Sequence, residues 1–370
     1  MRVLGNIERK GNNRFVAKYI WLLDEQETIT EDGFLSWYDT RANQSHRSAE
    51  WRLYYQTNAV TELMNEGDRL FIARQRDETI LFIVTPAHNS IESGLLWLFG
   101  LNLQSKLPFG AQEITKADDT KLDFTARFIL DEIGVEFEDP NANTLDSIIE
   151  RFENQFPSTK AFSDLARLTL PELDARDDPD IALLTWLDHE EAMFRRLEKK
   201  IVSNDISKGW MKGGEADVDS FIKYSLSVQN RRKSRMGHSF QNHLGAVFDA
   251  FEVRYDPQII TENGKKPDFI FPGKTEYEDV FFDTGLLTML AAKSSCKDRW
   301  SQILPEAKKI KQKHLVTLEP AISEAQTAIM KQTDVQLIVP GQIRKSYTAS
   351  QQEWIWSIND FVKLILERQK

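Results

Sequence analysis

Two segments decide the fold of this chain: PDFIFP at residues 267–272 and LAAKSSCKDRWSQILPE at residues 290–306. Each segment contains a short apolar run that predicts a buried strand. Asp268 lies at the end of one strand-like run and Lys293 at the end of the other, and Glu306 follows thirteen residues after that lysine. We expect a helix after the second strand to bring Glu306 back to the two strand ends.

Two acids and a lysine at strand ends suit a magnesium-dependent phosphodiesterase. Mg²⁺ prefers oxygen ligands and keeps part of its water shell, and a lysine can orient a water or neutralise developing charge. In the commonest form of such a site the second acid lies two residues before the lysine, where this chain has Ala291, so Glu306 would replace it. An ordinary structural interpretation remains open: Asp268 caps a strand, Lys293 is a surface residue, and Glu306 pairs with Lys309 along its helix.

The segment KDRW (297–300) favours DNA as the substrate. Lys297, Asp298 and Arg299 offer a donor, an acceptor and a second donor, which can read adjacent G·C pairs in the major groove. The alternative is an ordinary helix N-terminus, since apolar spacing predicts an amphipathic helix over residues 299–314.

A basic cluster precedes another expected helix. The cluster consists of Arg231, Arg232, Lys233 and Arg235 within NRRKSRMGHS, which we expect to join two helices. Ser239 is a plausible N-cap for the second helix, and basic residues at a helix N-terminus suit phosphate. The alternative is that the cluster is a solvated face.

Composition excludes several classes of protein. The chain has 370 residues and a formal net charge of -10, which argues against indiscriminate binding to a polyanion but not against a local basic groove. Its one cysteine, Cys296, excludes an intramolecular disulfide and a multi-cysteine metal site. We see no signal peptide and no apolar run of the roughly 18 residues that span a bilayer, so we expect a cytoplasmic protein without a membrane partner.

The pattern of elements predicts several domains. Residues 1–110 are β-rich, residues 111–150 form a linker, and residues 151–370 form an α/β (α+β) domain in which helices flank a mixed sheet. The acidic segment 171–180 is a solvated loop or a negative element that competes with DNA. Within the first domain, residues 37–56 concentrate side chains suited to nucleic acid, or form a solvated loop between strands; the candidates are Arg41, Arg47, Glu50 and Arg52.

These motifs resemble those of the EcoRII-type restriction endonucleases, the group that includes PspGI and SsoII. The resemblance rests on NRRKSRMGHSF (230–240), TENGKKPDFIFP (261–272) and MLAAKSSCKDRWSQILPEAKKI (289–310). A fainter resemblance to the amino-terminal DNA-binding domain of the same family rests on WYDTRANQSHRSAEWRL (37–53) and IESGLL (91–96).

The resemblance implies a PD-(D/E)XK nuclease core in which the second acid has moved onto the following helix, and a β-barrel-like, B3-type amino-terminal domain. It implies Mg²⁺ as cofactor, Asp268, Lys293 and Glu306 as catalytic residues, and residues 297–299 as the base-reading segment. It further implies a homodimer that cuts double-stranded DNA at a site with CC and GG flanks, and autoinhibition by the amino-terminal domain that effector DNA relieves.

One position departs from the family pattern. The helix after the basic cluster usually has a glutamate as a further metal-site acid, where this chain has Gln241. An amide removes one negative charge, which puts tight binding of a second metal in doubt. A catalytically weak or inactive DNA-binding protein therefore remains the alternative to a nuclease, and a structure-selective repair nuclease is a third, less favoured, reading.

Overall fold

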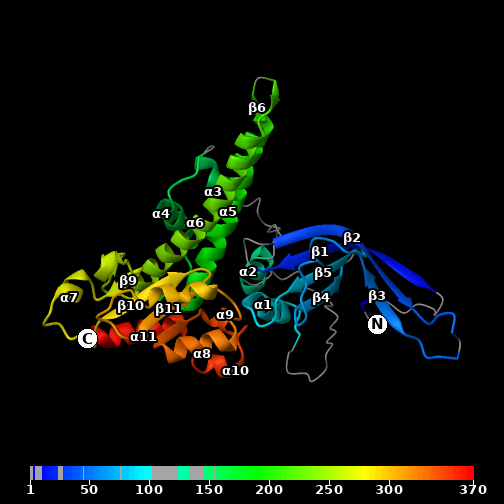
Figure 1. The fold of residues 1–370 in the computed structure, drawn as a ribbon. Coiled ribbons are helices and arrows are strands. Elements are labelled where there is room, and N and C mark those ends of the chain that lie inside the picture. The colour runs from blue at the N-terminus through cyan, green and yellow to red at the C-terminus, as the bar shows by residue number, and fades with distance from the viewer. Residues whose placement is uncertain are drawn as a thin grey trace. The chain divides into compact units, whose positions relative to one another are not determined.

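The computed structural model describes residues 3–4, 11–23, 28–44, 46–75, 77–101, 124–132, 145–152, 155–212 and 214–370. The chain divides into two compact units, residues 1–137 and residues 138–370 (Figure 1). Each unit has its own sheet and its own buried core. No helix among the described residues has an apolar stretch of the length that a bilayer requires.

The first unit is built on a five-stranded sheet in the order β3-β2-β1-β5-β4. β1 and β5 are parallel, and every other neighbouring pair is antiparallel. The elements are β1 (Asn12–Leu22), β2 (Thr28–Asp39), β3 (Trp51–Tyr55), β4 (Arg69–Arg74), β5 (Ile80–Thr85), α1 (Ser90–Leu98) and α2 (Phe124–Glu132). The expectation of a β-rich first domain is confirmed, whereas its barrel-like, B3-type character stays a prediction.

Alternation along β1 explains why this sheet is buried on both faces. Ala17 and Tyr19 point into one core cluster, while Ile20 and Leu22 point into a second cluster that includes Leu95 of α1. Because successive side chains of a strand point to opposite faces, one face of the sheet packs in the first core cluster and the other packs against α1.

Part of the predicted linker is helical. α2 belongs to the first unit and packs on α1, where Ile129 lies beside Gly94. α3 (Asp146–Ile149) belongs to the second unit. The boundary between the two compact units lies between residues 137 and 138, and the predicted domain boundaries at 110 and 150 stay predictions.

The second unit is a mixed α/β fold around a five-stranded sheet in the order β12-β11-β10-β9-β8. β10, β11 and β12 are parallel, whereas β9 and β8 are antiparallel to their neighbours. The strands are β8 (Asp256–Pro257), β9 (Phe269–Phe271), β10 (Thr288–Lys293), β11 (Lys313–Thr317) and β12 (Val335–Ile338). The predicted mixed sheet with helices is confirmed.

The helices of this unit alternate with its strands. They are α3, η2 (Glu150–Phe152), α4 (Thr159–Leu168), α5 (Pro179–Lys208), α6 (Val218–Ala250), η3 (Glu262–Gly264), α7 (Lys274–Glu278), η4 (Lys297–Ile303), α8 (Glu324–Gln332), α9 (Gly341–Arg344), α10 (Ala349–Gln352) and α11 (Ile358–Arg368). α6 and α11 cover the same face of the sheet, since Phe248 and Phe361 both pack on Phe271 of β9. The C-terminal helix α11 starts at Ile358, because the residue before it, Ser357, forms a capping box with Asp360.

The prediction of two helices joined by residues 230–239 is wrong. α6 is continuous, and with α5 it forms a long pair joined by the small hairpin of β6 (Met211–Lys212) and β7 (Glu215–Ala216) (Figure 1). Ser239 is buried within α6, and the actual N-cap is Asp217, so residue 239 offers no helix N-terminus to a phosphate. Packing against α4 and α5 outweighs the cost of about 1 kcal/mol for Gly237 within a helix.

Candidate active site

Asp268 lies immediately before β9 and faces the end of β10. It is 7% exposed. Its Oδ2 accepts hydrogen bonds from the backbone N–H of Ala292 at 2.8 Å and from Nζ of Lys293 at 3.3 Å. The antiparallel pairing of Phe269 with Leu290 brings these groups together, so the structure joins the first acid to the lysine.

Gln241 of α6 completes the surroundings of Asp268. Its Nε2 donates to Oδ1 of Asp268 at 2.7 Å, and its Oε1 accepts from Nε2 of Gln258 at 3.3 Å. A carboxylate only accepts hydrogen bonds, so the amide nitrogen of Gln241 must face it. The acceptor oxygens of Asp268 are therefore held by an amide, a lysine and a backbone N–H group.

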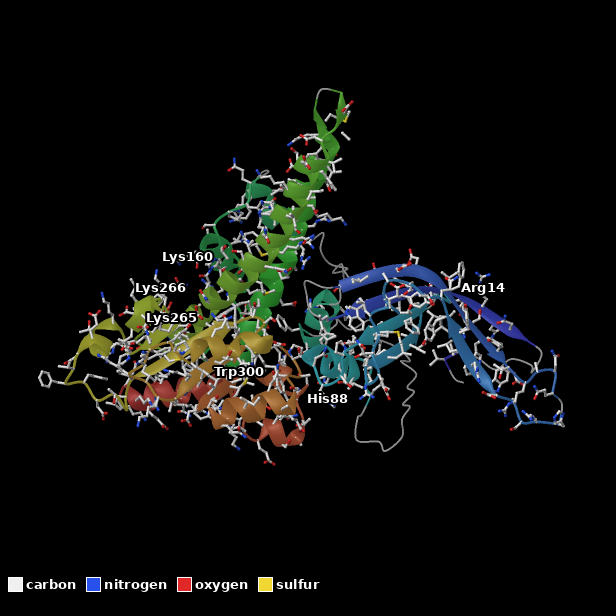
Figure 2. The ribbon with its side chains drawn as sticks, in the orientation of Figure 1. Arg14, His88, Lys160, Lys265, Lys266 and Trp300 are labelled. Carbon is white, nitrogen blue, oxygen red and sulfur yellow. The ribbon has the colours of Figure 1, made fainter. Side chains whose placement is uncertain are left out.

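Glu306 joins the site from the segment after η4. Burial raises the pKa of its carboxyl to about 7; Asp268 raises this pKa and Lys293 lowers it. Glu306 is therefore within electrostatic range of Asp268 and Lys293, and it stays a candidate member of their site. Lys265 also lowers the pKa of Glu306, and Figure 2 shows Lys265 and Lys266 extending from the segment before β9. Sequence reasoning missed these two lysines, whose only signal was their position just before Pro267.

The prediction that Glu306 lies on a helix over residues 299–314 is wrong. The segment is 3₁₀ only as far as Ile303 and then continues in turns. The backbone N–H of Ile310 donates to the carbonyl of Ala307, three residues back, and not to that of Glu306 as an α-helix would require.

The oxygens of this site suit a hard divalent cation. The carboxylates of Asp268 and Glu306 are the ligand type that Mg²⁺ takes, and Mg²⁺ completes its shell with water. Among the described residues, no group of three His, Cys, Asp or Glu side chains is placed to hold a metal, and the side chain that donates to Asp268 from α6 is the amide of Gln241. The residues present thus fit one Mg²⁺ held by two acids.

The structure corrects the predicted phosphate contacts. Arg235 is 7% exposed; its guanidinium lies over Phe162 and Phe194 and donates to the carbonyl of Pro157. The prediction that it contacts phosphate is therefore wrong, since solvent barely reaches it.

The other three basic residues of the cluster are nearer the surface. Arg231 is half-buried over Phe156, and Nε of Arg232 donates to Glu198 at 2.6 Å. Lys233 is exposed. These three residues keep the phosphate role as a prediction.

Residues 297–299, the predicted base-reading segment, form the start of η4. The side chains of residues 297–299 lie outside the described part of the structure, so their role stays a prediction. The flanking residues are anchored: Trp300 is buried, and the backbone N–H of Cys296 donates to Glu319 at 2.7 Å.

In the first unit, the arginine-rich segment joins β2 to β3. Glu50 is paired with Arg41 at 2.6 Å and with Arg52 at 2.8 Å, and the Arg52 hydrogen bond is the main reason why its pKa is lowered. The backbone N–H of Arg47 donates to Gln44 in the same turn. Three of the four predicted DNA-binding residues thus form one charged cluster at the end of the sheet.

Comparison with known proteins finds a family match within the second unit. Residues 194–362, which include Gln241, Asp268, Lys293 and Glu306, match the family described as EcoRII C terminal. The chain is 41% identical over 186 residues to the type II restriction enzyme EcoRII of Escherichia coli. That match covers 50% of this chain and 45% of the enzyme, so it spans less than half the length of this relative.

Two solved structures show weaker similarity. Metal-depleted Ecl18kI in complex with uncleaved DNA aligns over 61% of this chain and 84% of its own, with 17% identity and a TM-score of 0.48. A complex of the restriction endonuclease PspGI with substrate DNA aligns over 57% and 94%, with 16% identity and a TM-score of 0.44.

Proposed function

We propose that this chain is a site-specific double-stranded DNA endonuclease that uses Mg²⁺. The observation that carries the proposal is the convergence of Asp268, Lys293 and Glu306 inside the segment that matches the EcoRII C-terminal family. The fold around them is proposed to be a PD-(D/E)XK core with the second acid displaced to residue 306.

The site residues divide the work of phosphodiester hydrolysis. Asp268 and Glu306 would hold the ion, and Lys293, in contact with Asp268, would face the scissile phosphate and balance its developing charge. A bound Mg²⁺ would supply Lewis-acid stabilisation at the phosphate. The backbone N–H of Ala292 fixes one oxygen of Asp268 in the sheet, which keeps the acid oriented.

Sequence selection would come from Lys297, Asp298 and Arg299, which can read G·C pairs of a site with CC and GG flanks. Arg231, Arg232 and Lys233 would contact backbone phosphates. Because such a site is nearly two-fold symmetric, a homodimer formed through the second unit would match its symmetry.

The first unit would bind a second copy of the site through Arg41, Arg47, Glu50 and Arg52, and would inhibit the nuclease until it does so. Support comes from the charged cluster at the end of its sheet. Removal of residues 1–137, the whole of the first unit, tests this role: cleavage of DNA with a single site should rise, and unchanged cleavage would contradict inhibition.

A second candidate function is sequence-specific DNA binding with weak or no cleavage. The observation that favours it is Gln241, whose amide donates to Asp268 where a third acid would bind metal. This candidate predicts specific binding without product in either Mg²⁺ or Mn²⁺.

Cleavage of a mixed DNA substrate, followed by sequencing of the ends, tests the proposal directly. Lys293→Ala should abolish cleavage and leave DNA binding in place, whereas Lys331→Ala, which replaces an exposed lysine of α8, should cleave normally. Normal cleavage by the Lys293→Ala protein would refute the assignment of the site.

A further inference from the structure

A buried lysine holds the turn that carries Glu306. Lys313, the first residue of β11, is only 5% exposed. Its Nζ donates to the carbonyl oxygens of Glu306 at 2.6 Å, Ala307 at 2.9 Å and Ile310. An ammonium has three N–H groups, so all of its donors are used on this one turn.

The same contacts determine the shape of the turn. In an α-helix the carbonyl of Glu306 would point along the axis to the N–H of Ile310, but that N–H donates to Ala307 at 2.9 Å instead. Ala307 has a φ of 44°, a conformation that costs free energy in a residue other than glycine and needs compensation from its surroundings. Three charge-assisted hydrogen bonds from one ammonium supply that compensation.

The sheet fixes the position of this ammonium. The backbone N–H of Lys313 donates to Asp334 at 2.9 Å, and the next residue, His314, pairs with Leu290 of β10. β10 also carries Lys293. The turn of Glu306 is therefore tied to the same strands that place the lysine of the site.

We propose that Lys313 is a positioning residue of the nuclease site, which places the Glu306 carboxyl beside Asp268 without touching DNA or metal. This inference rests on the proposed function, since it assumes that Glu306 is a metal ligand. In this account the turn that Lys313 holds positions Glu306, whereas the sequence pattern predicted that a helix would do so.

Binding of Mn²⁺ to the full chain without DNA, measured by electron paramagnetic resonance, separates this role from a purely structural one. Lys313→Met removes all three donors at similar size, and it should weaken Mn²⁺ binding by about tenfold or more, as loss of outer-sphere support does elsewhere. Glu306→Ala should weaken binding similarly. The double variant should bind no more weakly than Glu306→Ala alone, because Lys313 acts through Glu306.

The results that overturn the inference are distinct. If Lys313→Met weakens Mn²⁺ binding by the same factor in the unmodified chain and in Glu306→Ala, the lysine acts on the whole domain and not on this acid. If folded Lys313→Met binds Mn²⁺ as the unmodified chain does, the positioning role fails while the proposed function stands. If Asp268→Ala also leaves binding unchanged, the metal site itself fails, and the inference fails with it.

Lys313→Gln serves as a second variant in case the methionine does not fold. It keeps two N–H donors on a shorter side chain, so its Mn²⁺ affinity should lie between those of the unmodified chain and Glu306→Ala. Affinity equal to that of the unmodified chain in this variant would also count against the inference.

Discussion

Gln241→Glu should make the stability of the second unit depend on a divalent metal. The amide nitrogen of Gln241 lies 2.7 Å from Oδ1 of Asp268, and the substitution would put a second carboxylate oxygen there. Two unit charges at that separation repel by about 6 kcal/mol at an effective dielectric constant of 20 and by about 1.5 kcal/mol at 80. The half-buried site lies between these limits, and one hydrogen bond is also lost, so we expect a destabilisation of about 3 kcal/mol without metal.

The assay is urea denaturation at pH 8 in EDTA and in Mg²⁺. A bound cation offsets the repulsion, and each tenfold gain in its affinity adds about 1.4 kcal/mol at saturating metal. The variant should therefore be much less stable than the unmodified chain in EDTA and recover in Mg²⁺, with faster cleavage. Gln229→Glu makes the same change at an exposed position of α6 and should have little effect in either condition. Equal stability of Gln241→Glu and the unmodified chain in EDTA would refute the contact with Asp268.

Two further predictions concern stability of the same unit. Asp180→Ala should lower the free energy of unfolding, measured in urea, by about 3 kcal/mol. The buried carboxylate of Asp180 accepts hydrogen bonds from the N–H groups of Gly341, Ile358 and Asn359 at 2.9–3.1 Å. Asp177→Ala, at an exposed position, is the control, and a loss below about 1 kcal/mol for Asp180→Ala would contradict this account. Burial lowers the pKa of His314 to about 3, so the unfolded chain takes up a proton below pH 6.5 that the folded chain does not. Stability should therefore fall by about 2 kcal/mol more between pH 7.5 and pH 5 in the unmodified chain than in His314→Leu, and parallel pH profiles of the two proteins would contradict this.

The sequence was sufficient to predict the mixed sheet and the placement of Asp268 and Lys293 at neighbouring strand ends. It was not sufficient to predict the conformation of the segments that carry Gln241 and Glu306. Short apolar runs next to Asp268 and Lys293, with Pro267 and Pro272 bounding the first run, favour strands over helices, so both polar residues are expected at strand ends. Continuity of α6 depends on packing, in which Arg235 inserts between Phe162 and Phe194. No local pattern reveals such a contact between residues more than 40 positions apart.

The turn of Glu306 escaped prediction for a related reason. Its apolar spacing favours a helix, and the sequence gives no sign that Lys313 captures the carbonyls of that segment. A lysine is usually a surface residue, so its burial becomes evident only once β11 is placed beside β10. Local preference thus lost to a tertiary contact of a single side chain.

The amide at position 241 stabilises this site when no metal is bound. Asp268 accepts from Gln241, Ala292 and Lys293 with no cation present, so the metal-free fold carries little electrostatic strain at this carboxylate. A glutamate at 241 would reverse this balance, since three acids repel one another until a cation binds. We infer that Gln241, compared with a glutamate at the same position, lowers the affinity of the site for metal and raises the stability of the metal-free fold. On that basis DNA phosphate, as a source of further oxygen ligands, would strengthen ion binding, so the affinity for Mg²⁺ should be higher with DNA than without it.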